Sequence, residues 1–283
     1  MRWAPGGQSD NVEDLRGQTG RGGGGMRLGL GGIVVLLILS VVFKQNFFAL
    51  LGGGGPGGGG SSSAQLSPAE QAREDTLVSF VSFVLDTTQA TWHHTLGNRY
   101  RDAKLVLFRD AIQSACGYAE EASGPFYCPG DEKVYIDLGF YDELKQRFGA
   151  PGDFAQAYVL AHEIGHHVQK LLEIEGKMRQ LQGQHPQEAN QLSVDLELQA
   201  DCFAGIWGHE AALENILESG DVEEGLNAAA AVGDDRIQRM STGRVNPDAF
   251  THGTSAQRVD WFKRGMQSGD LKSCDTFGSR DGT

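Results

Sequence analysis

Hydrophobic positions divide the chain into one apolar run near its start and a series of amphipathic segments after residue 67. The run LGLGGIVVLLILSVVF at 28–43 carries no charge, and after Lys44 the apolar character resumes and continues to Leu51. About twenty apolar residues cross a bilayer, and a lysine side chain can reach the interface from within such a run. We therefore expect residues 28–51 to form one transmembrane helix that serves as an uncleaved signal anchor. A buried core helix and a cleavable signal peptide are the alternatives. The Gly-rich flanks argue against the first, and no convincing Ala-x-Ala site supports the second.

The segments that flank this run predict a membrane topology. Residues 1–27 are polar and Gly-rich, which predicts a disordered segment. Arg21 and Arg27 precede the run and only Lys44 follows it closely, which predicts a cytoplasmic amino terminus. Residues 52–66 form a Gly/Ser-rich linker, and residues 67–283 then form a domain in the periplasm, outside the bacterial inner membrane.

The amphipathic part predicts long helices and a few short strands. Ser67, Pro68 and Glu70 match a helix N-cap, a first-turn proline and a capping box, and this helix is expected to end before His93-His94, which we interpret as surface residues. Alternating residues predict strands at 104–108 and 133–138. The second strand is either the sheet edge on which a peptide substrate pairs or an ordinary sheet strand. Helical periodicity predicts helices at 153–181, 187–206, 211–219 and 222–231, with a solvated charge cluster at 234–236. The fold class is mainly α with a small β-sheet, α+β.

A His-Glu-x-x-His motif lies on the first of these predicted helices. His162 and His166 are four residues apart, so their imidazoles project from one helix face and can share one metal ion. Glu163 lies about 100° around the helix, where it can act as a base on water near the metal. His167, one turn after Glu163, is expected to pack beside it.

A second motif supplies what the first lacks. A zinc ion held by two histidines needs a third protein ligand and one open position for catalysis. Glu197 follows His166 by 31 residues, which leaves room for a loop and a second helix. Asp201 lies one turn later on the same face and can accept a hydrogen bond from a ligand imidazole. The alternative is a helix with unrelated histidines and a solvated carboxylate pair.

Charge and cysteine content narrow the function further. The formal charge of −13 argues against a nucleic-acid partner. Four cysteines in a chain expected outside the cytoplasm suggest two disulfides. Three pairings are possible, and Cys116 with Cys128 is favoured because it closes a short loop, which leaves Cys202 to pair with Cys274.

One more histidine is a candidate for catalysis. His252 lies in a Gly/Ser/Thr turn before an amphipathic segment, and it could donate a hydrogen bond to the oxyanion of a tetrahedral intermediate. An ordinary turn histidine is an equally good interpretation.

Together these strings resemble the bacterial neutral zinc metallopeptidase family, whose members carry one N-terminal span. The similarity covers nearly the whole chain and includes residues 9–14, 124–129, 134–138, 161–169, 197–205 and 274–277. It implies a zincin-like domain behind one transmembrane helix, with one Zn²⁺ per chain.

The sequence also resembles the wider gluzincin group. This likeness implies that His162, His166 and Glu197 are ligands and that Asp201 orients a histidine. His252 and Arg258 are similar to a His-Pro…Arg segment whose histidine faces the substrate carbonyl, although Gly253 replaces the proline here.

We therefore hypothesise a membrane-anchored zinc endopeptidase that hydrolyses peptide bonds in the cell envelope, with Glu163 as general base and a peptide or protein as substrate. The alternative is a zinc-binding envelope scaffold or chaperone-like protein without proteolytic turnover. A third possibility is an enzyme kept latent by a plug over its cleft.

Overall fold

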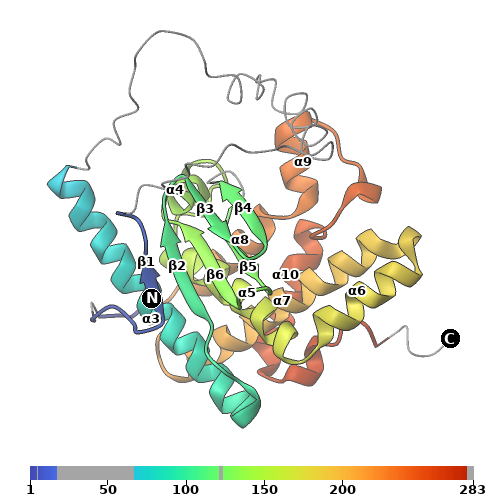
Figure 1. Cartoon of the computed structure of the whole chain (residues 1–283), viewed down its shortest axis with the longest axis horizontal. Helices are drawn as coiled ribbons and strands as arrows, with labels where there is room; N and C mark the ends of the chain where they lie inside the picture. Colours follow the sequence, from blue (N-terminus) through green and yellow to red (C-terminus); the bar gives the residue numbers. More distant parts are fainter. Residues whose placement is uncertain (5, 18–66, 121–123, 279–283) are drawn as a thin grey trace, which may run out of the picture.

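The computed structural model describes residues 1–4, 6–17, 67–120 and 124–278, whose elements are drawn in Figure 1. The strands are β1 (Val12–Asp14), β2 (Lys104–Phe108), β3 (Ala111–Ser114), β4 (Gly117–Glu120), β5 (Phe126–Cys128) and β6 (Lys133–Asp137). The helices are α3 (Pro68–Leu96), α4 (Gly139–Gln146), α5 (Asp153–Leu171), α6 (Ile174–Gln184), α7 (Ala189–Leu213), α8 (Asp221–Ala231), α9 (Asp234–Thr242) and α10 (Ser255–Ser268). Short 3-10 turns are η1 (Gly97–Arg99), η3 (Pro186–Glu188), η4 (Pro247–Ala249) and η5 (Leu271–Cys274). These elements confirm the α+β class.

The expected transmembrane helix at 28–51 and the linker at 52–66 lie outside the described residues. Within the described ranges, no helix combines the length and apolar character needed to cross a membrane.

The main sheet has the strand order β1-β2-β6-β5, in which β1, β2 and β6 are parallel and β5 is antiparallel to β6. Successive side chains of a strand point to opposite faces. Leu105 and Leu107 therefore join the main core with α3 and α5, while Val106 and Phe108 pack with Ile112 of the β3-β4 hairpin. Because β6 lies between β2 and β5, residues 133–138 form an ordinary sheet strand, which is the second of the two interpretations, and not the edge on which a substrate would pair. Among the described residues, the two edge strands of this sheet are β1 and β5.

Helix boundaries differ from the expected ones where a local backbone feature intervenes. The capping box of Ser67 and Glu70 is present, but α3 continues through the two histidines to Leu96. The helix expected over 153–181 is two helices, because Glu173 adopts φ of 61° and starts α6 in a new direction. The helix that carries Glu197 and Asp201, α7, extends to Leu213, and residues 214–220 are not helical, so the expected helix at 211–219 is also wrong.

The amino-terminal segment departs most from expectation. Residues 1–17, apart from residue 5, are part of the folded domain, so the prediction that they are disordered is wrong for this part of the chain. Val12 pairs with Leu105 in the sheet, and the indole of Trp3 packs edge-on against Phe80 of α3. The charged groups of this segment also form ion pairs with the domain, including Arg16 with Glu74 at 2.7 Å. The domain expected to begin at residue 67 therefore also includes this segment.

Small residues allow three helices to pack closely around the metal motifs. A Cβ atom added to Gly165 of α5 would lie 3.1 Å from the carbonyl oxygen of Ala200 in α7. A Cβ added to Gly265 of α10 would overlap the carbonyl oxygen of Cys202, also in α7. Since no side chain separates these backbones, α7 lies in direct contact with both α5 and α10 (Figure 1).

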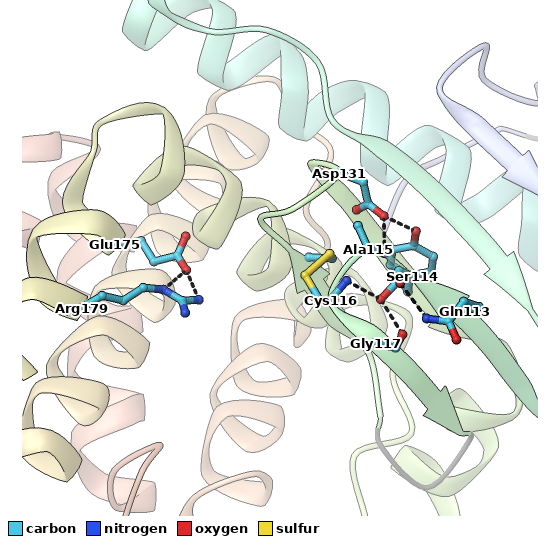
Figure 2. Close-up of a disulfide and its surroundings, with 10 residues drawn as sticks. Gln113, Ser114, Ala115, Cys116, Gly117, Asp131, Glu175 and Arg179 are labelled. Atoms are coloured by element: carbon cyan, nitrogen blue, oxygen red, sulfur yellow. Dashed lines mark hydrogen bonds and ion pairs between the residues drawn. A yellow bond between two sulfur atoms is a disulfide. The ribbon is translucent and has the colours of Figure 1, made fainter. Parts of the chain in front are cut away.

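Two disulfides reinforce this arrangement, and they have the pairing that loop length favours. Cys202 in α7 is bonded to Cys274 in η5, which ties η5 to the helix that carries Glu197. Cys116 is bonded to Cys128 at the end of β5 (Figure 2). Beside this second bond, Ser114 Oγ accepts the amide hydrogen of Cys116, and Asp131 accepts that of Ala115. The edge strand β5 is thus held to the β3-β4 hairpin.

Candidate metal centre and active-site cleft

The three proposed metal ligands converge although they come from two helices. Donor atoms of His162, His166 and Glu197 all lie within 4.8 Å of one another. His162 Nε2 is 3.2 Å from one carboxylate oxygen of Glu197, and His166 Nε2 is 3.5 Å from the other. The close contact of α5 with α7 at Gly165 brings Glu197 against the two imidazoles.

Asp201 orients the first histidine, as its position one turn after Glu197 suggests. Its Oδ1 lies 2.9 Å from His162 Nδ1, so Nδ1–H can donate and Nε2 is left with a lone pair. Arg258 of α10 holds the same carboxylate through two N–H groups, at 2.8 and 2.9 Å. The hydroxyl of Tyr158 also donates to Asp201. Asp201 is fully buried, and these donors compensate for its loss of hydration.

The second histidine is oriented by an amide instead of a carboxylate. His166 Nδ1 lies 2.8 Å from Gln169 Oε1, which again leaves Nε2 facing Glu197. The Gln169 amide donates to the Leu196 carbonyl of α7 at 2.7 Å and to Gln199. Gln199 in turn donates to the carbonyl of Cys274, so the second disulfide belongs to the same support.

The electrostatics of the cluster favour a cation. Burial alone would lower the pKa of His162, but Asp201 and Glu197 more than offset this effect and raise the pKa to about 9. Burial would raise the pKa of Glu197, yet the two neighbouring imidazoles hold it well below its usual range. Two Nε2 lone pairs that face a carboxylate repel it unless a proton or a metal ion lies between them.

The donor set fits zinc. Two imidazole nitrogens and one carboxylate are a common protein ligand set for catalytic zinc, with one position left for water or substrate. Both histidines have their Nδ1 atoms engaged by protein acceptors, as metal-ligating histidines usually do. The chain therefore supplies three ligands and their supporting hydrogen bonds.

The cluster opens into a cleft of about 580 Å³. Glu163 lines this cleft together with His162, His166 and Glu197. The opposite wall includes Tyr127 and the neighbouring residues of β5, so the free edge of the sheet faces the metal helix.

His167 packs toward the sheet and away from the cluster. Its Nδ1 lies 3.0 Å from the hydroxyl of Tyr127, and its Nε2 lies 2.8 Å from the carbonyl of Arg101. Burial lowers the pKa of His167, which keeps the ring neutral and able to accept from Tyr127. The contact links the edge strand to α5.

His252 lines the same cleft, as a role near the substrate requires. Its Nδ1 is 3.2 Å from Asp234 Oδ1, and this hydrogen bond raises the pKa of His252 despite partial burial. The other oxygen of Asp234 accepts the backbone N–H groups of Thr251, His252 and Gly253. The expectation that residues 234–236 form a solvated charge cluster is therefore wrong, because Asp234 is buried and shapes the His252 turn.

Several residues that hold the candidate site residues in place were not predicted from the sequence, for different reasons. Tyr158 precedes His162 by four residues and Gln169 follows His166 by three, so helical spacing alone could have identified both. Asp234 carries no such signal, because 18 residues separate it from His252. The two exposed histidines at 93 and 94 lie on α3, where His93 pairs with Asp102, and they do not line the cleft.

A mainly helical domain with two histidines and a glutamate at the floor of a cleft defines a zinc-peptidase-like class of protein. The sequence model of the family described as "Putative neutral zinc metallopeptidase" matches residues 1–277, and the chain belongs to this family. It is similar to "Uncharacterized protein YpfJ" of Escherichia coli K12, with 51% identity over 98% of this chain and 99% of the relative. It is also similar to "Uncharacterized protein Rv2575" of Mycobacterium tuberculosis H37Rv, with 42% identity over 69% of each chain. No solved structure matches the chain.

Proposed function

We propose that this protein is a zinc-dependent endopeptidase in which His162, His166 and Glu197 hold the metal and Glu163 is the general base. The observation that carries the proposal is the convergence of these three ligands at the floor of a cleft that Glu163 also lines. A structural zinc site usually fills all four positions with protein ligands and needs no base. Three ligands beside an open cleft therefore favour catalysis over a scaffold role.

The proposed chemistry divides between the metal and the side chains around it. Bound zinc would polarise the scissile carbonyl and lower the pKa of a water molecule to about 7. Glu163 takes a proton from the attacking water and later delivers it to the leaving amine. His252, whose pKa is raised by Asp234, donates a hydrogen bond to the oxyanion. Asp201 and Gln169 keep the two ligand imidazoles in orientation.

The central test is Glu163→Gln in the purified full chain. A glutamine has nearly the same shape but cannot accept a proton, so we expect one zinc per chain, measured by mass spectrometry, and a loss of cleavage of at least about a hundredfold. Glu210→Gln, a change on α7 away from the cleft, is the matched control. Equal cleavage by the Glu163 variant and the wild type would reject the mechanism. Bound zinc without cleavage in either protein would favour the scaffold function or a latent enzyme.

We also propose that residues 28–51 attach the enzyme to the bacterial inner membrane and that the peptidase domain lies in the periplasm. Two disulfides support an oxidising compartment. The pairing of β1 with β2 is not compatible with a single crossing between Gly17 and Ser67, because that crossing would separate the two strands. The proposal therefore has both flanks of residues 18–66 on the periplasmic face, in place of the cytoplasmic amino terminus expected from charge.

Cysteine labelling tests this topology. Gly7→Cys and Leu213→Cys each introduce one thiol at an exposed position, while the four native cysteines are disulfide-bonded. In cells with a permeabilised outer membrane, we expect a membrane-impermeant maleimide to label both variants. Labelling of Leu213→Cys alone would show that the amino terminus is cytoplasmic. This result would reject the proposal that both flanks of residues 18–66 lie on the periplasmic face.

A further inference from the structure

The two ends of the active-site cleft differ in chemistry. The end beside α4, α8 and α9 is lined mainly by large apolar side chains, namely Phe140, Phe148, Val159, Val232 and Ile237, although Glu143 and Arg147 also belong to the lining. The opposite end is bordered by α6, where Arg179 Nε lies 2.8 Å from Glu175 across one helical turn (Figure 2). A peptide that lies along the cleft therefore meets an apolar surface on one side of the metal cluster and a polar pair on the other.

The edge strand determines which side of the scissile bond faces the apolar end. A peptide that adds to β5 pairs most stably when it runs antiparallel to it, so its carboxyl-terminal part lies beside the start of β5. The residue just before β5 is Gly124, and a Cβ atom there would lie 3.8 Å from the ring of Phe140. The residues after the scissile bond are thereby directed toward the apolar end.

The position of Glu163 leads to the same assignment independently. The base must reach the amine that leaves, so it lies on the side of the residues after the scissile bond. Tyr141 is next to Phe140 on α4, and burial together with the nearby Glu163 carboxylate raises its pKa. Glu163 also lines the cleft together with Phe140 of α4. Val159 lies on α5, three residues before His162, and it also lines the cleft toward the apolar end.

We propose that the enzyme selects peptides with a large apolar side chain directly after the scissile bond, which binds against Phe140, Val159 and Val232. This selectivity rests on the proposed peptidase function and adds its substrate class. Leucine, isoleucine or phenylalanine would exclude water from the apolar end. Aspartate at the same position would lose hydration against these side chains, and the buried Arg258 in the cleft lining is already paired with Asp201.

Cleavage mapping on the zinc-loaded full chain tests the proposal. In peptide pairs that differ only in the residue after the cleaved bond, we expect kcat/KM for leucine to exceed that for aspartate by at least about tenfold. A large residue before the bond should have a smaller effect. Cleavage that depends on Glu163 but shows no apolar preference after the bond would overturn this proposal and leave the peptidase function intact.

A matched pair of variants locates the selectivity. Ile237 and Val245 are 37% and 38% exposed, but only Ile237 lines the cleft. We expect Ile237→Asp to reduce the leucine-to-aspartate ratio at least severalfold, while Val245→Asp leaves it unchanged. An unchanged ratio in both variants would contradict the placement of the substrate side chain.

A binding experiment covers the case of a latent enzyme. Dipeptide hydroxamates bind zinc through the hydroxamate and place their next side chain in the cleft, so they need no turnover. With the zinc-loaded Glu163→Gln full chain, we expect calorimetry to show a Kd for the leucyl compound at least about tenfold below that for the aspartyl compound. Equal affinity, or no measurable binding of the leucyl compound, would overturn the proposal.

Discussion

The two helices that carry the candidate metal ligands, α5 and α7, and the amino-terminal segment are parts of one domain, yet only the helix pair is recognisable in the sequence. In α5, two histidines four residues apart share a face because the helix places them there. In β1, only three residues join the sheet, and their partners are about ninety residues away. The difference shows that a site within regular helices can be predicted from local spacing. A short strand such as β1 can be identified only from the distant strand with which it pairs.

The amino-terminal segment owes its order to many separate contacts. The Met1 ammonium lies 2.9 Å from Asp153 and 3.4 Å from Asp221, on α5 and α8. Lys133 of β6 reaches Glu13 at 2.7 Å, and Ser9 donates to Asp86 of α3. These polar contacts lie at irregular spacing, and few apolar residues accompany them, so the composition of this segment was indistinguishable from that of a disordered tail.

Removal of the third ligand should have the largest effect. Glu197→Ala leaves two histidines and opens the site to water, so we expect less than one-tenth of a zinc per chain and a loss of peptidase activity of at least about a thousandfold. The fold should persist, because the disulfide and the contacts of α7 remain. Metal analysis, peptide cleavage and circular dichroism check this outcome, with Glu210→Ala as control. A variant that retained stoichiometric zinc would remove Glu197 from the ligand set.

Substitutions in the turn that carries His252 should have the next largest effect on peptidase activity. Since Asp234 raises the pKa of His252, the charged imidazole persists to higher pH and its pairing stabilises the fold below that pKa. This stabilisation is lost as the pH rises through the raised pKa. Asp234→Asn can still accept the three backbone N–H groups, but it cannot pair with a positive charge.

We therefore expect Asp234→Asn to shift the alkaline limb of the pH profile of kcat/KM to lower pH, and His252→Ala to reduce the rate by roughly a hundredfold. NMR titration of the His252 ring gives the pKa directly. An alkaline limb at the same pH in Asp234→Asn would show that His252 does not cause it.

The amino-terminal segment can be tested by placing a charge in its buried strand. Val12 is 8% exposed, and Val12→Asp should lower the free energy of unfolding by roughly 2–4 kcal/mol because a carboxylate would lose its hydration there. The same change at exposed Val245 should cost less than about 0.5 kcal/mol. Denaturant unfolding of the purified full chain measures both. Equal stability of the two variants would indicate that residues 1–17 are a detached tail.

A smaller effect is expected at the contact between the two metal helices. The methyl group of Gly165→Ala would lie 3.1 Å from the Ala200 carbonyl, so α7 must move by a few tenths of an ångström and take Glu197 with it. We expect a severalfold loss of zinc affinity, measured by competition with a chelator. Gly176→Ala, in α6 with open space around it, should leave the affinity unchanged. Equal affinities would mean that the site tolerates this displacement.

The motifs, the presence of the main helices and the favoured disulfide pairing could be predicted from the sequence, because each depends on residue spacing along one element or loop. The capping box at Ser67, the ligands at 162 and 166, and the carboxylate pair at 197 and 201 are of this kind. The direction change at Glu173 could not be predicted in this way, because a positive φ at a glutamate depends on the packing of the helices on either side.

Tertiary structure alone decided which strand is the sheet edge, where the amino terminus lies and how Asp234 meets His252. Each of these depends on pairing between segments far apart in the chain, where many alternative partners have similar local patterns. The free energy that selects among them comes from burial and from satisfied polar groups in the assembled domain, and no single segment contains it.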